Sequence, residues 1–437
     1  MVRLEPKRYS RRGEIGSAAV KTRRTSGASN GPSNAPFDRW FRYPAGFSRP
    51  TLNTALQTAS LKPGDLLIDP FLGAASGYRE GVARGIQYAG LEVHPEIAEL
   101  AQLKMSTLPR PQRIVDDAKL VSQETRQADT TRETELVSRS FDRHVLQKLV
   151  GIRNELQTRP RKGTGRYLKW CLLGALRDCA NVQVRWPYQR PRVARRPRIA
   201  HPDRAFLRRA EWMAEDLQHA TNPVARVLQG DARRLDHWKR VLGGRTADAI
   251  VTSPPYLNNF DYADATRLEL YFWGIARTWS EMVTRVRADM LTATTQQARK
   301  AAAEESMYRL ARMAPHTAST LGAIIDKLQR ERTLRVRGKE YDRVIGPYFE
   351  GMSRVFKNAR RCSRPQARVV IVIGDSAPYG IHVNTPAILA ALALELGFQL
   401  VGLEEIRQRG TRWLQNGTRH ERLLSEQLLV LETPSTQ

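Results

Sequence analysis

The sequence lacks the features that mark several protein classes. No apolar run approaches the roughly 20 residues that a membrane-spanning helix needs, which excludes a membrane protein. The three cysteines, Cys171, Cys179 and Cys362, are too few and odd in number for a disulfide scaffold, which fits a reducing compartment. The histidines form no metal-spaced cluster with these cysteines, so we expect no metal site. The absences together predict a cytoplasmic protein.

Acidic residues are also scarce relative to basic ones. The 437 residues include 71 Lys and Arg against 44 Asp and Glu, a formal net charge of +27. Such a surplus favours a polyanionic partner, and nucleic acid is the first expectation. A hydrophobic content of 41% excludes wholesale disorder. The length suggests roughly two or three domains, or one large domain with insertions.

Short apolar runs that alternate with helical segments predict an α/β fold with a mainly parallel sheet. A basic tail over residues 1–36 is expected to be disordered, and a short helix is expected over about 50–60. The predicted strands are 66–68, 88–92, 225–228, 248–251, 368–373, 398–403 and 426–431. They place a catalytic domain over residues 37–104 plus 225–434.

Two helical insertions interrupt this series, and neither contains an obvious strand. The first, 105–224, is basic and carries an Arg-rich segment over 185–209 that includes Trp186 and Tyr188. That segment is suited to contact phosphates or guanine edges, although a solvated basic face is an equal interpretation. We therefore expect 105–224 to recognise the target, with Thr411–Trp413 as a second candidate. The other insertion, 266–343, lies within the catalytic domain.

The loop after the first strand has the residues of a ligand-binding turn. Asp69-Pro70-Phe71-Leu72-Gly73-Ala74-Ala75-Ser76-Gly77 connects that strand to an expected helix over 78–84. Small residues there let the backbone approach a ligand at the carboxyl end of the strand. Glu92 ends the second strand, where an acid can accept hydrogen bonds from both ribose hydroxyls, and Asp231 ends the third, where it could meet an adenine amino group. An ordinary turn with surface acids is the alternative.

Ser253-Pro254-Pro255-Tyr256 directly follows the fourth strand and is the most specific motif. Consecutive prolines cannot donate backbone hydrogen bonds and have fixed φ angles, so they hold the preceding carbonyls rigidly. A Ser hydroxyl beside a fixed carbonyl can accept both hydrogens of an amine and orient its lone pair. Tyr256 offers a flat face on which a base can stack. A rigid turn with a packed Tyr is the alternative.

These motifs resemble those of the amino-directed, S-adenosylmethionine-dependent DNA methyltransferases, most closely the Ser-Pro-Pro-Tyr enzymes that methylate cytosine at N4. The segments 43–47, 256–262 and 372–376 are also similar to one branch of that family, and the resemblance covers roughly 37–105 and 225–432. It implies a Rossmann-like methyltransferase sheet, S-adenosylmethionine as cofactor and duplex DNA as substrate, with a cognate restriction endonuclease as a conceivable partner.

The resemblance also implies a role for individual residues. Phe71 and Gly73 would bound the methionine part of the cofactor, with Asp69 at the base of the loop, Glu92 on the ribose and Asp231 on the adenine. In the Ser-Pro-Pro-Tyr motif, Ser253 and the Pro254 carbonyl, which Pro255 fixes, would grip the target amine. Tyr256 would stack on the base. One departure is Ala75, where the family usually has glycine, and this predicts weaker cofactor binding or a different loop path.

Several functions remain open at this stage. Adenine N6 is an alternative target, because Ser in place of Asp or Asn before the two prolines only biases the choice. An RNA methyltransferase is a further alternative, and so is an inactive DNA-binding protein that keeps the fold. Cytosine-C5 methylation needs a catalytic cysteine, and none of the three cysteines lies in a suitable context. A duplex target requires base flipping.

Overall fold

A computed structural model describes residues 35–43, 47–160, 163–185, 188–221, 223–258, 260–409 and 423–435. The tail predicted over 1–36 therefore lies almost entirely outside the described residues, as does Thr411–Trp413. The strands are β1 (Leu66–Asp69), β2 (Gln87–Glu92), β3 (Val182–Arg185), β4 (Tyr188–Ala194), β5 (Ala225–Gln229), β6 (Ala247–Thr252), β7 (Ser363–Gly374), β8 (Gln399–Arg409) and β9 (Leu424–Glu432).

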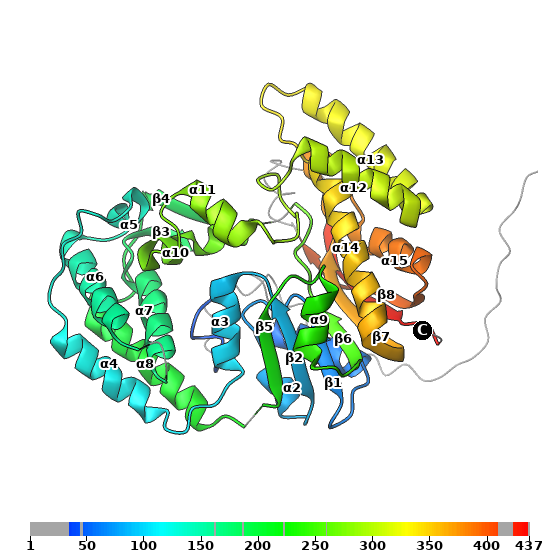
Figure 1. The fold of residues 1–437 in the computed structure, drawn as a ribbon. Coiled ribbons are helices and arrows are strands. Elements are labelled where there is room, and N and C mark those ends of the chain that lie inside the picture. Colours follow the sequence, from blue (N-terminus) through cyan, green and yellow to red (C-terminus); the bar gives the residue numbers. More distant parts are fainter. Residues whose placement is uncertain are drawn as a thin grey trace, which may run out of the picture.

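The α-helices lie between and beside these strands (Figure 1). They are α1 (Arg49–Thr58), α2 (Arg79–Val82), α3 (Pro95–Lys104), α4 (Gln112–Glu124), α5 (Glu135–Arg139), α6 (Arg143–Thr158), α7 (Gly165–Cys179), α8 (Pro202–Gln218), α9 (Leu235–Leu242), α10 (Arg267–Trp273), α11 (Trp279–Met282), α12 (Lys300–Met313), α13 (Pro315–Thr333), α14 (Asp342–Cys362) and α15 (Thr385–Glu395).

Seven strands form one sheet in the order β5-β2-β1-β6-β7-β9-β8. All neighbours from β5 to β7 pair in parallel, whereas β9 runs antiparallel to both β7 and β8. This sheet confirms the predicted α/β class and the Rossmann-like methyltransferase architecture. Since β8 is antiparallel to β9, its carboxyl end lies at the same edge as those of β1, β2, β5, β6 and β7. We call this the carboxyl edge of the sheet.

Both faces of the sheet are covered at β1, where successive side chains point to opposite faces. Leu66 and Ile68 face the apolar cluster made with α9, α14 and α15, while Leu67 faces the cluster made with α1 and α2. Every residue of β1 is buried. A strand without an exposed face reads as a continuous apolar run, which is why the short run 66–68 was sufficient to predict it.

A separate apolar cluster unites α4–α8 with α3 and α10, and we call this unit the helical body. The aromatic side chains of Phe37, Trp40 and Phe41 insert into it. Trp40 Nε1 donates to Asp216 of α8 at 2.8 Å. A buried ion pair between Arg177 and Glu269, at 2.6 Å, ties α7 to α10. The segment before the sheet and the start of 266–343 therefore pack against the first insertion.

The expectation that 105–224 contains no strand is wrong. Strands β3 and β4 form an antiparallel hairpin in the Arg-rich part of the insertion, with Val184 opposite Gln189. Val182 and Val184 point into the helical body, and this alternation with Gln183 was obscured by the surrounding arginines and prolines. In Figure 1 the hairpin lies beside α10 and α11, whereas α12 and α13 project on the other side of the molecule, above α14.

Among the residues that the structure describes, no helix is long and apolar enough to cross a membrane.

Candidate active site

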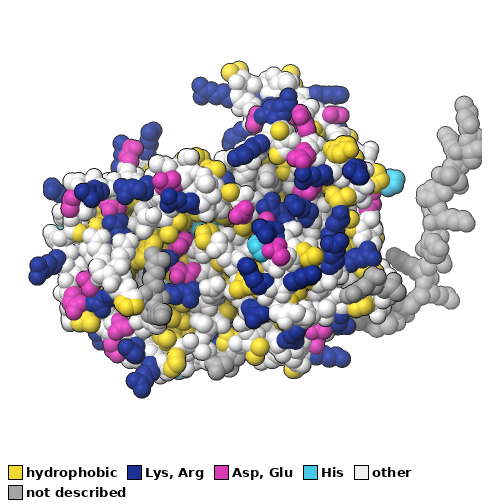
Figure 2. Space-filling view, in the orientation of Figure 1, with side chains coloured by type: hydrophobic (Ala, Val, Ile, Leu, Met, Phe, Trp, Pro, Cys, Tyr) yellow, Lys and Arg dark blue, Asp and Glu magenta, His cyan; other side chains and the backbone are white. Residues whose placement is uncertain are grey.

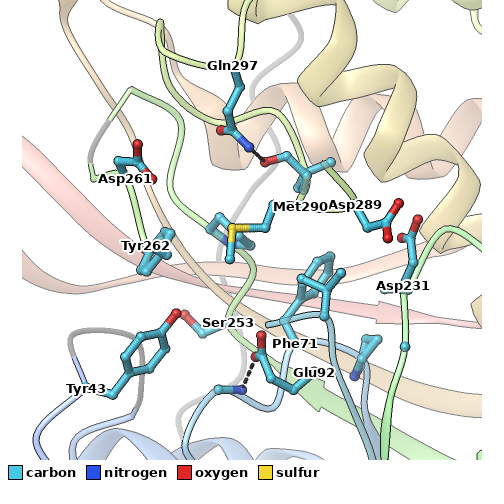
Figure 3. A pocket seen from close by; sticks show the side chains of 17 residues that line it. Tyr43, Phe71, Glu92, Asp231, Ser253, Asp261, Tyr262, Asp289, Met290 and Gln297 are labelled. Atoms are coloured by element: carbon cyan, nitrogen blue, oxygen red, sulfur yellow. Dashed lines mark hydrogen bonds between the residues drawn. The ribbon is translucent and has the colours of Figure 1, made fainter. Parts of the chain in front are cut away.

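One pocket opens at the carboxyl edge of the sheet, with an empty volume of about 670 Å³ (Figure 3). Six residues singled out in the sequence line it: Phe71, Gly73, Glu92, Asp231, Ser253 and Pro255. They come from the ends of four different strands or the loops that follow them. Because parallel strands end at a common edge, residues up to 184 positions apart in the chain share one cavity.

The loop after β1 is held by Asp69, which lies below the pocket rather than in its lining. The buried Asp69 carboxylate accepts from the Phe71 backbone N–H at 2.8 Å, the Tyr78 hydroxyl at 2.5 Å and the Thr252 hydroxyl at 2.5 Å. Burial raises the pKa of Asp69 to about 6, against the effect of these bonds. Asp69 therefore joins the start of the loop to the end of β6.

Ala75 adopts the conformation that favours glycine. Its φ is +51°, in the left-handed region, and Gly73 and Gly77 have φ of +56° and +74°. For a residue with a Cβ, this costs about 1–2 kcal/mol. The loop thus has left-handed backbone conformations at 73, 75 and 77, and the strain lies at Ala75. The two outcomes predicted for Ala75, weaker cofactor binding or a different loop path, stay predictions.

Glu92 is a buried carboxylate aimed at the pocket, with 8% of its surface exposed. One oxygen accepts from the Gly73 N–H at 2.9 Å and the other from the His94 N–H at 2.7 Å. Burial raises its pKa to about 7, against the effect of these two backbone hydrogen bonds. A carboxylate can accept about four hydrogen bonds, so Glu92 keeps acceptor capacity for a ligand hydroxyl.

Asp231 lines the pocket as predicted, and its neighbour Arg233 holds it there. The Arg233 guanidinium bonds to both carboxylate oxygens, with Nε to Oδ1 and Nη2 to Oδ2 each at 2.9 Å. The same Nη2 donates to the Asp289 carbonyl at 2.8 Å. Arg233 thus joins Asp231 to the segment that contains Asp289, and the two carboxylates lie side by side in Figure 3.

The Ser-Pro-Pro-Tyr motif lies only partly in the pocket. Ser253 points into the cavity and lies close to the Tyr43 hydroxyl in Figure 3. Pro254 is buried, and neither Pro254 nor Tyr256 is among the lining residues. The Tyr256 hydroxyl donates to Glu426 at 2.6 Å, and the Arg409 guanidinium covers its ring at 5.1 Å from the centroid. The structure therefore does not leave this face of Tyr256 open.

Sequence reasoning assigned no role to several lining residues. These are Tyr43, Asp261, Tyr262, Asp289, Met290, Leu291 and Gln297, besides the small residues of the loops. The segments 43–47 and 256–262 had been noted for their resemblance, which was the available signal for three of them. The segment 289–297 carried no such sequence signal, because it is a loop without a periodic pattern. Gln297 holds this loop: it donates to the Leu291 carbonyl at 3.1 Å and accepts from the Ala293 N–H at 2.9 Å.

The pocket is acidic in a strongly basic chain. Glu92, Asp231, Asp261 and Asp289 contribute four carboxylates, whereas the lining includes no Lys or Arg among the residues that the structure describes. Asp261 is paired with Arg287, as Asp231 is with Arg233. Apolar side chains of Phe71, Val93, Met290 and Leu291 surround these acids. The lining is suited to an amphipathic ligand that carries positive charge and hydroxyl donors.

No group of His, Cys, Asp or Glu in the described part of the chain is arranged to hold a metal ion. His94 instead ties the site together. It caps α3 and its Nε2 lies 2.8 Å from the Thr266 hydroxyl, so the end of β2 is joined to the segment that follows the catalytic motif. Burial lowers the pKa of His94 to about 3, which keeps it neutral.

Relatives of this chain occur among bacterial methyltransferases. The type II methyltransferase M.BsoBI of Geobacillus stearothermophilus is 20% identical over 445 aligned positions, covering 92% of this chain and 86% of that protein. The type II methyltransferase M.AvaI of a Nostoc species is 26% identical over 190 positions, or 43% of this chain and 38% of that protein. The relatives support a methyltransferase.

Other comparisons add little to this result. No protein-family model matches the chain. Among solved structures, the rRNA methyltransferase AviRa of Streptomyces viridochromogenes covers 89% of this chain and 86% of its own at 11% identity, with a TM-score of 0.29. A TM-score this low leaves the choice of substrate untouched.

Proposed function

We propose that the protein is a site-specific DNA methyltransferase that transfers a methyl group from S-adenosylmethionine to the exocyclic N4 amine of cytosine. The observation that carries the proposal is the single pocket that joins Ser253 to Glu92, Gly73 and Asp231. Similarity to type II methyltransferases over most of the chain supports the same reaction class and a DNA substrate. An amine-binding motif and an acidic ligand pocket are the two parts that such a reaction requires.

The residues present fit S-adenosylmethionine. Glu92 faces the pocket, where its carboxylate would accept from the ribose hydroxyls, and the left-handed conformation at Gly73 brings the backbone against the pocket. Asp231, which Arg233 keeps in place, would accept from an adenine amine. The lining contains four acids and no cation among the described residues, and two of these acids are paired with arginines outside the lining; the remaining acids, Glu92 and Asp289, favour a positively charged sulfonium. When bound, the cofactor supplies a methyl group on that sulfonium.

Ser253 and the Pro254 carbonyl then prepare the nucleophile. The exocyclic amine is a weak nucleophile because its lone pair delocalises into the ring. By accepting both amine hydrogens, the hydroxyl and the carbonyl favour a more tetrahedral nitrogen whose lone pair faces the methyl donor. The amine nitrogen would form the new bond to the methyl carbon as the bond between that carbon and the sulfonium sulfur breaks, which leaves the uncharged thioether S-adenosylhomocysteine. The nitrogen would then lose one proton to solvent, so no covalent enzyme intermediate is needed.

The target base would stack on Tyr256 after it is flipped out of the duplex. Ser in the first position of the motif favours cytosine, and adenine N6 is the second candidate because the grip on an amine is the same for both. RNA methylation is less well supported because the relative that covers most of the chain is a type II methyltransferase. An inactive DNA-binding protein is less well supported because Gly73, Glu92, Asp231 and Ser253 share one pocket.

DNA would be held by cationic side chains outside the pocket. Lys and Arg side chains are spread over the face shown in Figure 2, in contrast to the four acids of the pocket. The insertion 105–224 is proposed as the target-recognition region, and its hairpin and the segment after it expose Arg192 and Arg196. As a type II enzyme acting on the host's DNA in the cytoplasm, it would serve with a cognate restriction endonuclease.

The test is methyl transfer in vitro. Purified protein is incubated with methyl-labelled S-adenosylmethionine and duplex DNA, and the nucleosides are separated after digestion. The proposal predicts label in N4-methylcytosine and its loss in Ser253→Ala, with cofactor affinity kept. Label in N6-methyladenine would move the function to the second candidate, and label only in RNA would refute a DNA enzyme.

A further inference from the structure

The side chain of Arg409 contacts Tyr256 of the Ser-Pro-Pro-Tyr motif, although Arg409 belongs to β8, the last strand in the order of the sheet. Arg409 is the last residue of β8, and β8 ends at the carboxyl edge, two strands beyond β7. Its guanidinium lies over the Tyr256 ring, with Cζ 5.1 Å from the ring centroid. Nη2 donates to the Asp375 carbonyl at 2.6 Å, just past the end of β7. Arg409 therefore bridges β8, β7 and the motif after β6.

Gly374 makes room for this arrangement. A Cβ built on Gly374 would lie 2.6 Å from both Cζ and Nη2 of Arg409. The guanidinium is thus seated directly on the backbone at the end of β7. A glycine at this point of the strand has a specific use, which is to let a planar cation lie flat between the sheet and Tyr256.

The seated guanidinium keeps unused donor capacity. Nε of Arg409 is buried and has no hydrogen-bond partner among the described residues. Burial raises the pKa of both Tyr256 and Tyr262, and the charge of Arg409 acts in the opposite direction on each of them. Arg409 therefore lies within electrostatic range of Tyr262, which lines the pocket, as well as over Tyr256.

The chemistry of the two candidate bases differs at the edge next to the amine. Along its Watson–Crick edge, cytosine presents two successive acceptors, N3 and O2, after its N4 amine. Along the same edge, adenine presents one acceptor, N1, followed by a C–H, and its N7 acceptor lies on the opposite side of the N6 amine. A guanidinium carries several N–H donors in a fixed planar fork, so it matches two adjacent acceptors and not one.

We propose that Arg409 is a positioning residue that selects cytosine, donating hydrogen bonds to N3 and O2 of the base while Ser253 and Pro254 hold the amine. This inference rests on the proposed methyl transfer. In the DNA-free structure the guanidinium covers the stacking face of Tyr256. On base entry it cedes that face and presents its donors to the base edge, still tethered through Nη2 to Asp375.

Gly374→Ala is the sharpest variant, because the added methyl displaces only the far end of a flexible side chain and leaves the charge in the protein. Arg409→Met removes the donors at similar length, and Arg409→Lys keeps the charge without the fork. Arg364→Met is the matched control: this arginine lies at the opposite end of β7, with 53% of its side chain exposed.

The measurement is kcat and KM for methyl transfer to two duplexes that differ only in cytosine or adenine at the target position. We expect Gly374→Ala and Arg409→Met to lower kcat/KM on cytosine by about tenfold or more, to leave the rate on adenine within about twofold, and to keep cofactor affinity. The kcat/KM of Arg409→Lys on cytosine should lie between the values of these two variants and the wild-type value. Arg364→Met should have the wild-type kcat/KM on both bases.

Equal losses on both bases, or none on either, would overturn the role of Arg409. A wild-type protein that methylates neither duplex would instead overturn the proposed function, so the two failures are distinct. Should Gly374→Ala not fold, as judged by circular dichroism and cofactor binding, the ratio of the two bases in Arg409→Met decides the question.

Discussion

The titration of Glu92 gives a quantitative prediction for cofactor binding. Burial raises its pKa from 4.5 to about 7 in the free protein. Ribose hydroxyls donate to the ionised carboxylate, so the bound state favours ionisation and only the ionised fraction binds well. That fraction falls by about tenfold between about pH 8 and about pH 6, and we expect the affinity for S-adenosylmethionine to fall by the same factor.

The stability of the free protein should follow the opposite trend. A carboxyl whose pKa is raised on folding contributes stability that is fully present below its unfolded value of 4.5 and is lost as the pH rises through about 7. Between about pH 6 and about pH 8 this loss from Glu92 is on the order of 1 kcal/mol of unfolding free energy. Lower pH therefore strengthens the fold while it weakens cofactor binding.

Isothermal titration with S-adenosylmethionine and urea denaturation, each at the two pH values, measure both trends. Glu92→Gln does not titrate, so it should lose the tenfold pH ratio in affinity, and comparison with it removes any titration of the cofactor itself. Glu305→Gln should retain the ratio, because Glu305 is an acid of α12 outside the lining with 61% of its side chain exposed. The same pH ratio in wild type and Glu92→Gln would refute the role of Glu92.

Three further predictions concern Tyr256, Ala75 and the hairpin formed by β3 and β4. Tyr256→Phe keeps the ring but loses the bond to Glu426, so kcat should fall by about tenfold, whereas Tyr256→Ala should abolish transfer; equal rates in both would exclude stacking. Ala75→Gly relieves about 1 kcal/mol of backbone strain and loses a buried methyl worth about 0.8 kcal/mol. These effects nearly cancel, so the unfolding free energy measured by urea denaturation should change by less than about 0.5 kcal/mol. Ala75→Val should lower it by more than about 2 kcal/mol. Arg192→Ser combined with Arg196→Ser should lower DNA affinity and reduce its salt slope by about 2 in anisotropy titrations, with cofactor affinity unchanged; an unaltered slope would remove this segment from the interface.

The central strands of the sheet could be predicted because they are apolar and buried on both faces, whereas β8 is mostly exposed. Leu66–Ile68 and Val369–Ile373 have no polar side to confuse the pattern, and each lies before a loop with recognisable turn residues. The hairpin β3–β4 could not be predicted in the same way. Its apolar alternation covers only Val182 and Val184, and arginines and prolines follow at once.

The site was predicted where function depends on a local motif and missed where it depends on distant loops. Glu92, Asp231 and Ser253 follow strands directly, so topology alone brings them to one edge. Met290 reaches the pocket from a loop with no periodic pattern, and Arg409 reaches Tyr256 across two strands. Such contacts depend on loop paths and side-chain directions, which the pattern of residues along the sequence does not specify.

The central claim is that the pocket joining Glu92 to Ser253 methylates cytosine in DNA. The most direct measurement is expression of the full chain in a methylation-free host, followed by sequencing that detects modified bases. We predict N4-methylcytosine at one recurrent sequence with the wild type and none with Ser253→Ala. Unmodified host DNA, from a folded protein that binds S-adenosylmethionine, would contradict the claim.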